Sequence, residues 1–168
     1  MKVLTFVLAI CMLSIIGCSS DEEKMLAEGM DAYTYYDWET ALALLTPLAE
    51  DGHPEAQIRL GSMYYFGFGV FRDQATAVKW YTLAAEQGHA SALYMLGHAN
   101  EWGGGVPENK VYAHMWYNLS RVQGHRDGAY ERDVMEEEMT AAEIAYAEQL
   151  AYACHINEFK GCLRIYIR

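Results

Sequence analysis

The sequence predicts an all-α protein, a right-handed α-solenoid of antiparallel helix pairs that ends in a capping pair of helices. Residues 56–89 recur 36 residues later, with 13 of the 34 positions identical. A fixed period in this range is typical of stacked supersecondary units. Helix-capping residues and helix-ending glycines also alternate at regular intervals along the chain. With 52% apolar residues, the chain can form a packed core.

The two copies share small, apolar and aromatic residues. The positions Ala56, Leu60, Gly61, Gly67, Gly69, Val70, Ala77, Trp80, Tyr81, Leu83, Gln87, Gly88 and His89 recur as Ala92, Leu96, Gly97, Gly103, Gly105, Val106, Ala113, Trp116, Tyr117, Leu119, Gln123, Gly124 and His125. Gly61 and Gly97 stand within predicted helices, where glycine costs about 1 kcal/mol relative to alanine. A close crossing of two helices at each glycine would explain this cost. The core between the units is expected to contain the rings of Trp80, Tyr81, Trp116 and Tyr117.

The N-terminus is predicted to be an export signal. Lys2 precedes an apolar run, Val3 to Ile16, that is too short to span a bilayer comfortably and suits a signal peptide. The run ends at Gly17-Cys18, which resembles a bacterial lipobox and implies cleavage at residue 17 and lipid attachment to Cys18. An ordinary secretory signal is the alternative. In lipoproteins of this kind, Ser19 after the cysteine implies the outer membrane, with the domain facing the periplasm.

Charge excludes two classes of partner. Without residues 1–17 the chain keeps 11 basic and 23 acidic side chains, a net charge of −12. This charge repels phosphate backbones, so no nucleic acid is expected as a partner. It also repels anionic headgroups, so membrane attachment is expected through the N-terminal acyl chains only. The sequence leaves the oligomeric state open.

The remaining cysteines form a pair. Cys11 leaves with the signal and Cys18 takes the lipid, which leaves Cys154 and Cys162. An even pair in an oxidising compartment predicts a disulfide, which would contribute about 2–3 kcal/mol. Two free thiols are the alternative.

Capping residues place the helices in order. Ser20 with Glu23 predicts a capping box for a helix over 21–35, and Asp37 begins a second helix over 38–50. The second unit pairs a helix over 54–65 with one over 74–87, capped by Asp73. The third pairs 91–102 with 110–123, capped by Asn109. The loops 66–71 and 103–107 separate the helices of these two units.

A capping pair of helices is expected after residue 125. One helix covers 126–138, and Thr140 with Glu143 predicts a capping box for another that reaches 154. Glu136 to Glu138 provide the polar outer face that ends a repeat array. The change from Ala84-Ala85 to Ser120-Arg121 indicates a third unit that is looser or shaped to receive the cap. The predicted division is a signal peptide (1–17), a lipid site and tether (18–20), a repeat domain (21–155; units 21–52, 53–88, 89–124 and cap 125–155) and an extended or disordered tail (156–168).

The pattern A-x-x-x-L-G, G-x-G-V, A-x-x-W-Y and Q-G-H resembles Sel1-like repeats. Residues 56–125 match it twice, and residues 23–55 resemble a tetratricopeptide-type unit. The run Met139-Thr140-Ala141-Ala142-Glu143 resembles the cap that often ends bacterial Sel1-like proteins. This resemblance implies a solenoid whose first helices line a concave groove.

No pattern of residues predicts catalysis. The chain has no H-E-x-x-H, S-x-x-K or G-x-S-x-G, and Gly103 to Gly105 lack the Lys-Ser/Thr of a P-loop. Penicillin-binding or lactam-hydrolysing Sel1-like proteins carry a cysteine pair in each repeat, which is absent here. His53, His89 and His125 stand about 10 Å apart along the stack, so they cannot share a metal and are expected to open helices. We therefore expect no enzyme activity, no cofactor and no metal.

The first helices provide the candidate binding residues. Counted from the glycines, the groove positions are Met30, Tyr33, Ile58, Ser62, Tyr65, Tyr94, His98, Glu101 and Trp102, of which about half are expected to pack into neighbouring units. Aromatic residues with a few acids suit a protein or peptide segment. The predicted function is a non-catalytic, lipid-anchored adaptor or scaffold for a protein or peptide partner in the cell envelope. The alternatives are a cell-wall or β-lactam amide hydrolase and a purely structural, self-associating lipoprotein.

Overall fold

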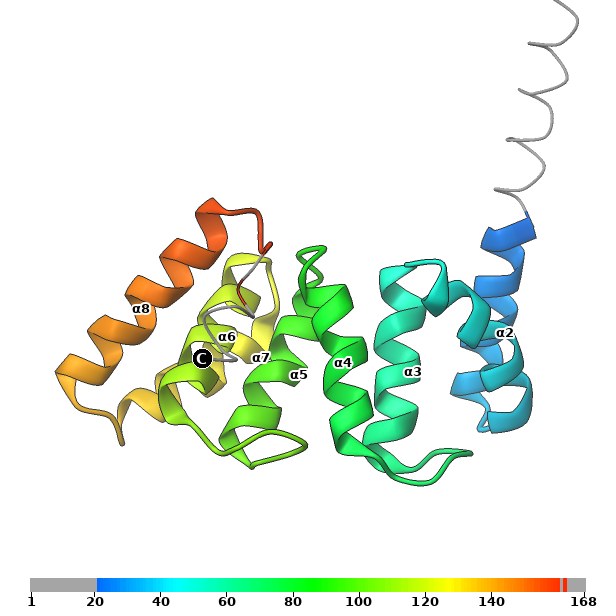
Figure 1. The fold of residues 1–168 in the computed structure, drawn as a ribbon, viewed down its shortest axis with the longest axis horizontal. Coiled ribbons are helices and arrows are strands. Elements are labelled where there is room, and N and C mark those ends of the chain that lie inside the picture. Colours follow the sequence, from blue (N-terminus) through cyan, green and yellow to red (C-terminus); the bar gives the residue numbers. More distant parts are fainter. Residues whose placement is uncertain (1–20, 161, 163–168) are drawn as a thin grey trace, which may run out of the picture.

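A computed structural model describes residues 21–160 and Cys162 (Figure 1). The predicted signal peptide, Cys18 and residues 163–168 lie outside the described residues. The described chain forms eight helices and no strand, over residues 21–34, α2 Trp38–Glu50, α3 Pro54–Phe66, α4 Gln74–Ala85, α5 Ala90–Glu101, α6 Lys110–Val122, α7 Arg126–Glu136 and α8 Ala141–Ile156. None of these helices is both long and apolar enough to cross a membrane.

The helices stack in the order of the chain. Figure 1 shows the first helix and α2 at one end of the molecule and α8 at the other, with α3 to α7 between them. Helices α3 and α4 pack against each other, as do α5 and α6, and α4 packs on α5 to join these two units. At the C-terminal end, α6 contacts both α7 and α8. The predicted all-α solenoid is confirmed.

Side-chain caps begin the second helix of each unit. The capping oxygens of Asp37, Asp73 and Asn109 accept from the backbone N–H groups of the residues three positions later, at 3.2, 3.1 and 3.1 Å. Thr140 and Glu143 form the predicted capping box of α8. Each cap satisfies a backbone donor that the helix itself leaves unpaired, and therefore fixes where the helix begins.

Two glycines within helices permit the closest packing in the solenoid. A Cβ atom on Gly61 would lie 2.7 Å from the Tyr81 ring, and one on Gly97 would lie 2.5 Å from the Tyr117 ring. Both tyrosine rings are fully buried. The predicted close crossing is therefore confirmed, because only glycine leaves room for the ring of the facing helix.

The predicted ring core is confirmed at three of its four positions. Trp116 is buried together with Tyr81 and Tyr117. Trp80 is only half-buried, and packs at the side of the cluster formed by the first unit and α3. Trp116, by contrast, belongs to a core cluster that extends to Leu150, Ala151 and Cys154 of α8.

The third unit is shaped to receive the cap. Gly128 of α7 lies against Ser120 of α6, where a Cβ atom on the glycine would also approach the carbonyl oxygen of Tyr117 to 3.2 Å. Ser120 is fully buried. The structure therefore supports the explanation that Ser120 shapes the third unit to receive the cap, rather than the explanation of a looser unit.

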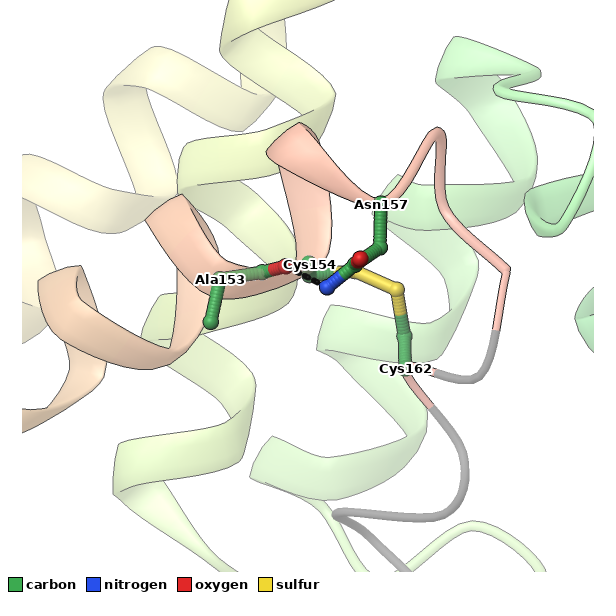
Figure 2. Close-up of a disulfide and its surroundings, with 4 residues drawn as sticks. All are labelled: Ala153, Cys154, Asn157 and Cys162. Carbon is green, nitrogen blue, oxygen red and sulfur yellow. Dashed lines mark hydrogen bonds between the residues drawn. A yellow bond between two sulfur atoms is a disulfide. The ribbon is translucent and has the colours of Figure 1, made fainter.

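A disulfide holds the chain beyond α8 against the solenoid (Figure 2). Cys154 and Cys162 are bonded, with their Cα atoms 5.1 Å apart, and Nδ2 of Asn157 donates to the carbonyl oxygen of Ala153 at 2.7 Å. Within this turn Phe159 is buried, and its ring packs beside the Cα atom of Gly88. Part of the segment assigned to the tail therefore belongs to the folded core.

We expect Gly97→Ala to destabilise the protein. Alanine would gain up to about 1 kcal/mol of helix propensity, but its methyl group would overlap the buried Tyr117 ring at a cost of about 1–3 kcal/mol. Thermal and urea unfolding would measure the balance. In a Tyr117→Leu background the same substitution should cost less, because the crowding ring is gone; an equal cost in both backgrounds would contradict the proposed contact.

Candidate functional site

Side chains of successive first helices contact one another and form a continuous face. Arg59 of α3 lies over the Tyr33 ring, with its guanidinium carbon 5.4 Å from the ring centroid. The Tyr65 hydroxyl lies 3.2 Å from Nδ1 of His98 in α5. The Tyr94 ring of α5 in turn stacks on His125, the N-cap of α7, with centroids 4.6 Å apart. We call the surface formed by these side chains the first-helix face.

The structure divides the nine predicted groove residues into two groups. Ile58, Ser62 and Tyr65 are 4%, 8% and 5% exposed, so they contribute almost no surface. The six that retain surface are Met30, Tyr33, Tyr94, His98, Glu101 and Trp102.

Ser62 shows why part of the expected groove is core. Its hydroxyl donates to the carbonyl oxygen of Ile58 at 3.0 Å and accepts from the Tyr81 hydroxyl at 3.3 Å. These bonds hold Ser62 beneath the second helix of its own unit. For Ile58 and Ser62 the assignment to a binding groove is therefore corrected to a role in packing, whereas the buried Tyr65 also lines a pocket.

A polar network occupies the N-terminal half of the face. Glu55 accepts from Arg59 at 2.8 Å and pairs with Nε2 of His89 at 3.0 Å. The hydrogen bond from His89, together with the charge of Arg59, holds the pKa of Glu55 below its usual value. Glu55 thus joins α3 to the start of α5, and it also fixes the guanidinium that lies over Tyr33.

The C-terminal half of the face is acidic. Glu101 accepts a 2.6 Å hydrogen bond from the Tyr117 hydroxyl, and burial together with this carboxylate raises the pKa of Tyr117. Burial and the charge of Glu101 also raise the pKa of Glu131. Burial raises the pKa of Tyr94, as do the charges of Glu131 and Asp127. Within the described chain, no lysine or arginine pairs with Asp127 or Glu131, so this end presents uncompensated negative charge.

A pocket of about 360 Å³ opens where α3 and α5 end. Its lining combines rings with polar side chains: Tyr65, Phe66, Arg72, Gln74, His98 and Trp102. The buried Tyr65 provides the floor, whereas Phe66 and Trp102 are 53% and 69% exposed. We call this site the loop-edge pocket, because the loops after α3 and α5 border it.

The three repeat-related histidines occupy N-cap positions of helices, and only His125 caps its helix with its side chain. His53, His89 and His125 are the N-cap residues of α3, α5 and α7, as the sequence predicts. Nδ1 of His125 accepts from the backbone N–H of Gly128 at 3.3 Å. Across residues 21–160 and 162, no group of three potential ligands is placed to hold a metal ion.

Sequence reasoning missed the residues that shape the pocket and charge the face. Arg72 and Gln74 follow the glycine loop, and Asp127 and Glu131 lie in the capping helix α7. The predicted groove residues all lie in the first helices of the repeats or at the C-terminal end of one, and none of these four residues does. Two differences between the repeats could have indicated the pocket. Phe68 is replaced by Gly104 36 residues later, and Trp38 is replaced by Gln74.

The comparisons with known proteins agree on one family of repeats. The family described as Sel1 repeat matches residues 54–89 and 90–125. A protective antigen of uropathogenic Escherichia coli with an SLR fold is 26% identical, with a TM-score of 0.78 over 85% of this chain and 31% of its own. A Sel1 repeat protein from Oxalobacter formigenes is 33% identical, with a TM-score of 0.60 over 66% of this chain and 45% of its own. The chain thus spans less than half the length of either protein. No curated protein matches the sequence.

We expect Glu55→Gln to lower the free energy of unfolding at neutral pH and to lower it by less in acid. A carboxylate whose pKa is lowered in the folded state stabilises that state above the pKa of the unfolded chain, about 4.3. The contribution is lost as the pH falls through the lower pKa of the folded state. Thermal unfolding from pH 7 to pH 3 should therefore show the wild type and the variant converging. A constant difference in melting temperature across this range would contradict the role of the charge.

Proposed function

Because this chain contains two Sel1 repeats, we propose that it is a non-catalytic binding module that presents its first-helix face to a protein or peptide partner. Sel1 repeats generally mediate protein–protein interaction and form a non-catalytic scaffold. The observation that carries the proposal is a set of three contacts between successive units, Arg59 with Tyr33, Tyr65 with His98 and Tyr94 with His125, which align side chains on one face.

The rings of this face suit partner binding because the protein already holds them in place. Tyr94 stacks on His125 and also contacts the Tyr117 ring, with centroids 4.6 and 5.5 Å apart. Side chains fixed before binding lose little conformational freedom when a partner arrives, so more of the contact energy contributes to affinity. Trp102 adds an exposed indole, a residue type enriched among the energetically dominant positions of interfaces.

The acidic half of the face gives the partner a preferred charge. Burial raises the pKa of Glu131, and the nearby charges of Glu101 and Asp127 raise it further, so these carboxylates repel one another. A basic group on the partner would relieve this repulsion and would also accelerate encounter at low salt.

We further propose that the module is exported and attached by lipid to the outer membrane, facing the periplasm. The apolar run from Val3 to Ile16 and the lipobox resemblance at Cys18 support export and lipidation. The disulfide between Cys154 and Cys162 supports an oxidising compartment, because such bonds are rare in reducing ones. With only residues 19 and 20 between Cys18 and the first described helix, the face would act close to the membrane surface.

The double substitution Tyr94→Ala with Trp102→Ala tests the first-helix face. Crosslinking in intact envelopes, followed by mass spectrometry, should recover a partner with the wild type and lose it with this variant. Loss of the two rings should weaken binding by about 2 kcal/mol or more. The matched control is Tyr146→Ala with Tyr152→Ala, which removes two exposed rings of α8, outside the first helices.

Two results would count against this assignment. An undiminished partner signal from a folded Tyr94→Ala, Trp102→Ala protein would exclude the face as the binding surface. Crosslinks only between copies of the chain, with matching association in sedimentation, would instead favour the structural, self-associating protein.

Cys18→Ser is expected to abolish lipid attachment. In cells fed a radiolabelled fatty acid, the wild-type protein should acquire label and fractionate with outer membranes. The variant should remain unlabelled, because serine provides no thiol for the lipid. Equal labelling of both proteins would disprove the proposed anchor.

A further inference from the structure

The loop-edge pocket lies between equivalent rings of two successive units. Phe66 and Trp102 stand 36 residues apart, the period of the repeat, at the ends of α3 and α5. Both rings border the pocket and both are more than half exposed. Within the described residues, no side chain fills the space between them, which leaves two large apolar surfaces in contact with water.

One unit earlier, the protein fills the equivalent site with its own side chain. There Phe68 stacks on Trp38, with ring centroids 4.8 Å apart and planes at 9°, and on Phe66, with centroids 5.4 Å apart. Tyr33 approaches the same ring edge-on at 6.5 Å. The first site is therefore an aromatic cage that holds a phenyl ring.

The two sites correspond residue by residue. Gly104 occupies the position of Phe68, and Gln74 occupies the position of Trp38, each 36 residues later. The equivalent loop glycines, Gly69 and Gly105, pack against the same place in each site. A Cβ atom on Gly69 would lie 2.5 Å from Cβ of Trp38, and a Cβ atom on Gly105 would lie 2.8 Å from the backbone nitrogen of Ala75, next to Gln74. The second site thus lacks both the inserted ring and the ring on which it stacks, and this loss creates the pocket.

The remaining walls of the cage are retained. Tyr65 takes the place of Tyr33, and its hydroxyl lies 3.2 Å from His98, the residue equivalent to Ser62. Gly104 is packed so closely on Tyr65 that a Cβ atom would lie 3.0 Å from the edge of the tyrosine ring. The pocket is therefore an emptied copy of a ring-binding cage rather than an accidental gap.

A positive charge distinguishes the second site from the first. Arg72 lines the pocket where the first unit has Tyr36. Burial raises the pKa of the Tyr65 hydroxyl and the Arg72 guanidinium opposes this change, which places the charge near the pocket floor. No carboxylate pairs with Arg72 in the part of the chain that the structure describes. The exposed Arg72 guanidinium is therefore available to pair with an anionic ligand at the pocket.

We propose that the loop-edge pocket binds an aromatic side chain of a peptide segment in which a carboxylate flanks the ring. This inference deepens the proposed function, on which it rests. The partner's ring would enter beside Gln74 and Trp102, in the place that Phe68 fills between Trp38 and Phe66 one unit earlier. The flanking carboxylate would pair with Arg72, whose planar guanidinium matches a carboxylate with two parallel hydrogen bonds.

Two substitutions test the ring and the charge separately. Gln74→Trp restores the indole of the filled site and should close the pocket from the solvent side. Arg72→Glu reverses the charge and leaves the rings unchanged. The matched control is Phe71→Ala, which removes a highly exposed ring from the same loop but from outside this pocket.

Isothermal titration of the purified protein with blocked peptides supplies the measurement. The probes are SDFDS, its basic counterpart SKFKS and its ringless counterpart SDADS, each acetylated and amidated. We expect SDFDS to bind at least about tenfold more tightly than SDADS, because burying a phenyl ring contributes this much. Arg72→Glu should weaken SDFDS by about fivefold and favour SKFKS. Gln74→Trp should abolish binding of SDFDS, whereas Phe71→Ala should leave it unchanged.

Several outcomes would overturn the proposal. Equal binding of the three peptides, no binding of SDFDS at about 1 mM, or unchanged binding of SDFDS by Gln74→Trp would each do so. Preference for SKFKS by the wild type would assign the pocket to a basic segment instead. In each case, crosslinking in intact envelopes with the single variant Tyr94→Ala still tests the first-helix face separately, because Tyr94 lies outside the pocket, so failure of the pocket is distinguishable from failure of the binding module.

Discussion

The architecture depends on the contact between a glycine in the first helix of a unit and a tyrosine ring in the second. At Gly61 and Gly97 the missing side chain admits the rings of Tyr81 and Tyr117 against the helix backbone. Because both rings are fully buried, the distance between the two helices is set by the thickness of an aromatic ring. Repetition of this contact every 36 residues gives successive units the same register.

A regular register makes each departure from the repeat visible as a change in surface. Where Phe68 becomes Gly104 and Trp38 becomes Gln74, a filled cage becomes an open pocket. Where an alanine becomes Ser120, the third unit accepts Gly128 of the cap rather than another repeat. The pocket and the termination of the array are thus encoded in the same way, by small substitutions on an unchanged scaffold.

Two different interactions secure the capping helices at the C-terminal end of the molecule. Nε2 of the fully buried His114 in α6 lies 2.9 Å from Oε1 of Glu136 in α7. The disulfide from Cys154 holds Phe159 against the turn before α5. These contacts fix the capping helices, and with them the carboxylate of Glu131, relative to the first helices. The acidic half of the first-helix face therefore depends on the cap as much as on the repeats.

The sequence by itself determined the period, the helix ends and the close crossings, because these follow from local chemistry. Aspartate and asparagine, such as Asp73 and Asn109, cap a helix that follows them directly. A glycine within a helix indicates that another helix packs closely at that point. Only the tertiary structure decided which side chains remain on the surface. Ile58 and Tyr94 occupy equivalent positions, yet Ile58 is buried and Tyr94 is not, because the unit that follows covers one and not the other. Helical spacing defines a face, but the side chains of the next unit determine how much of it is left for a partner.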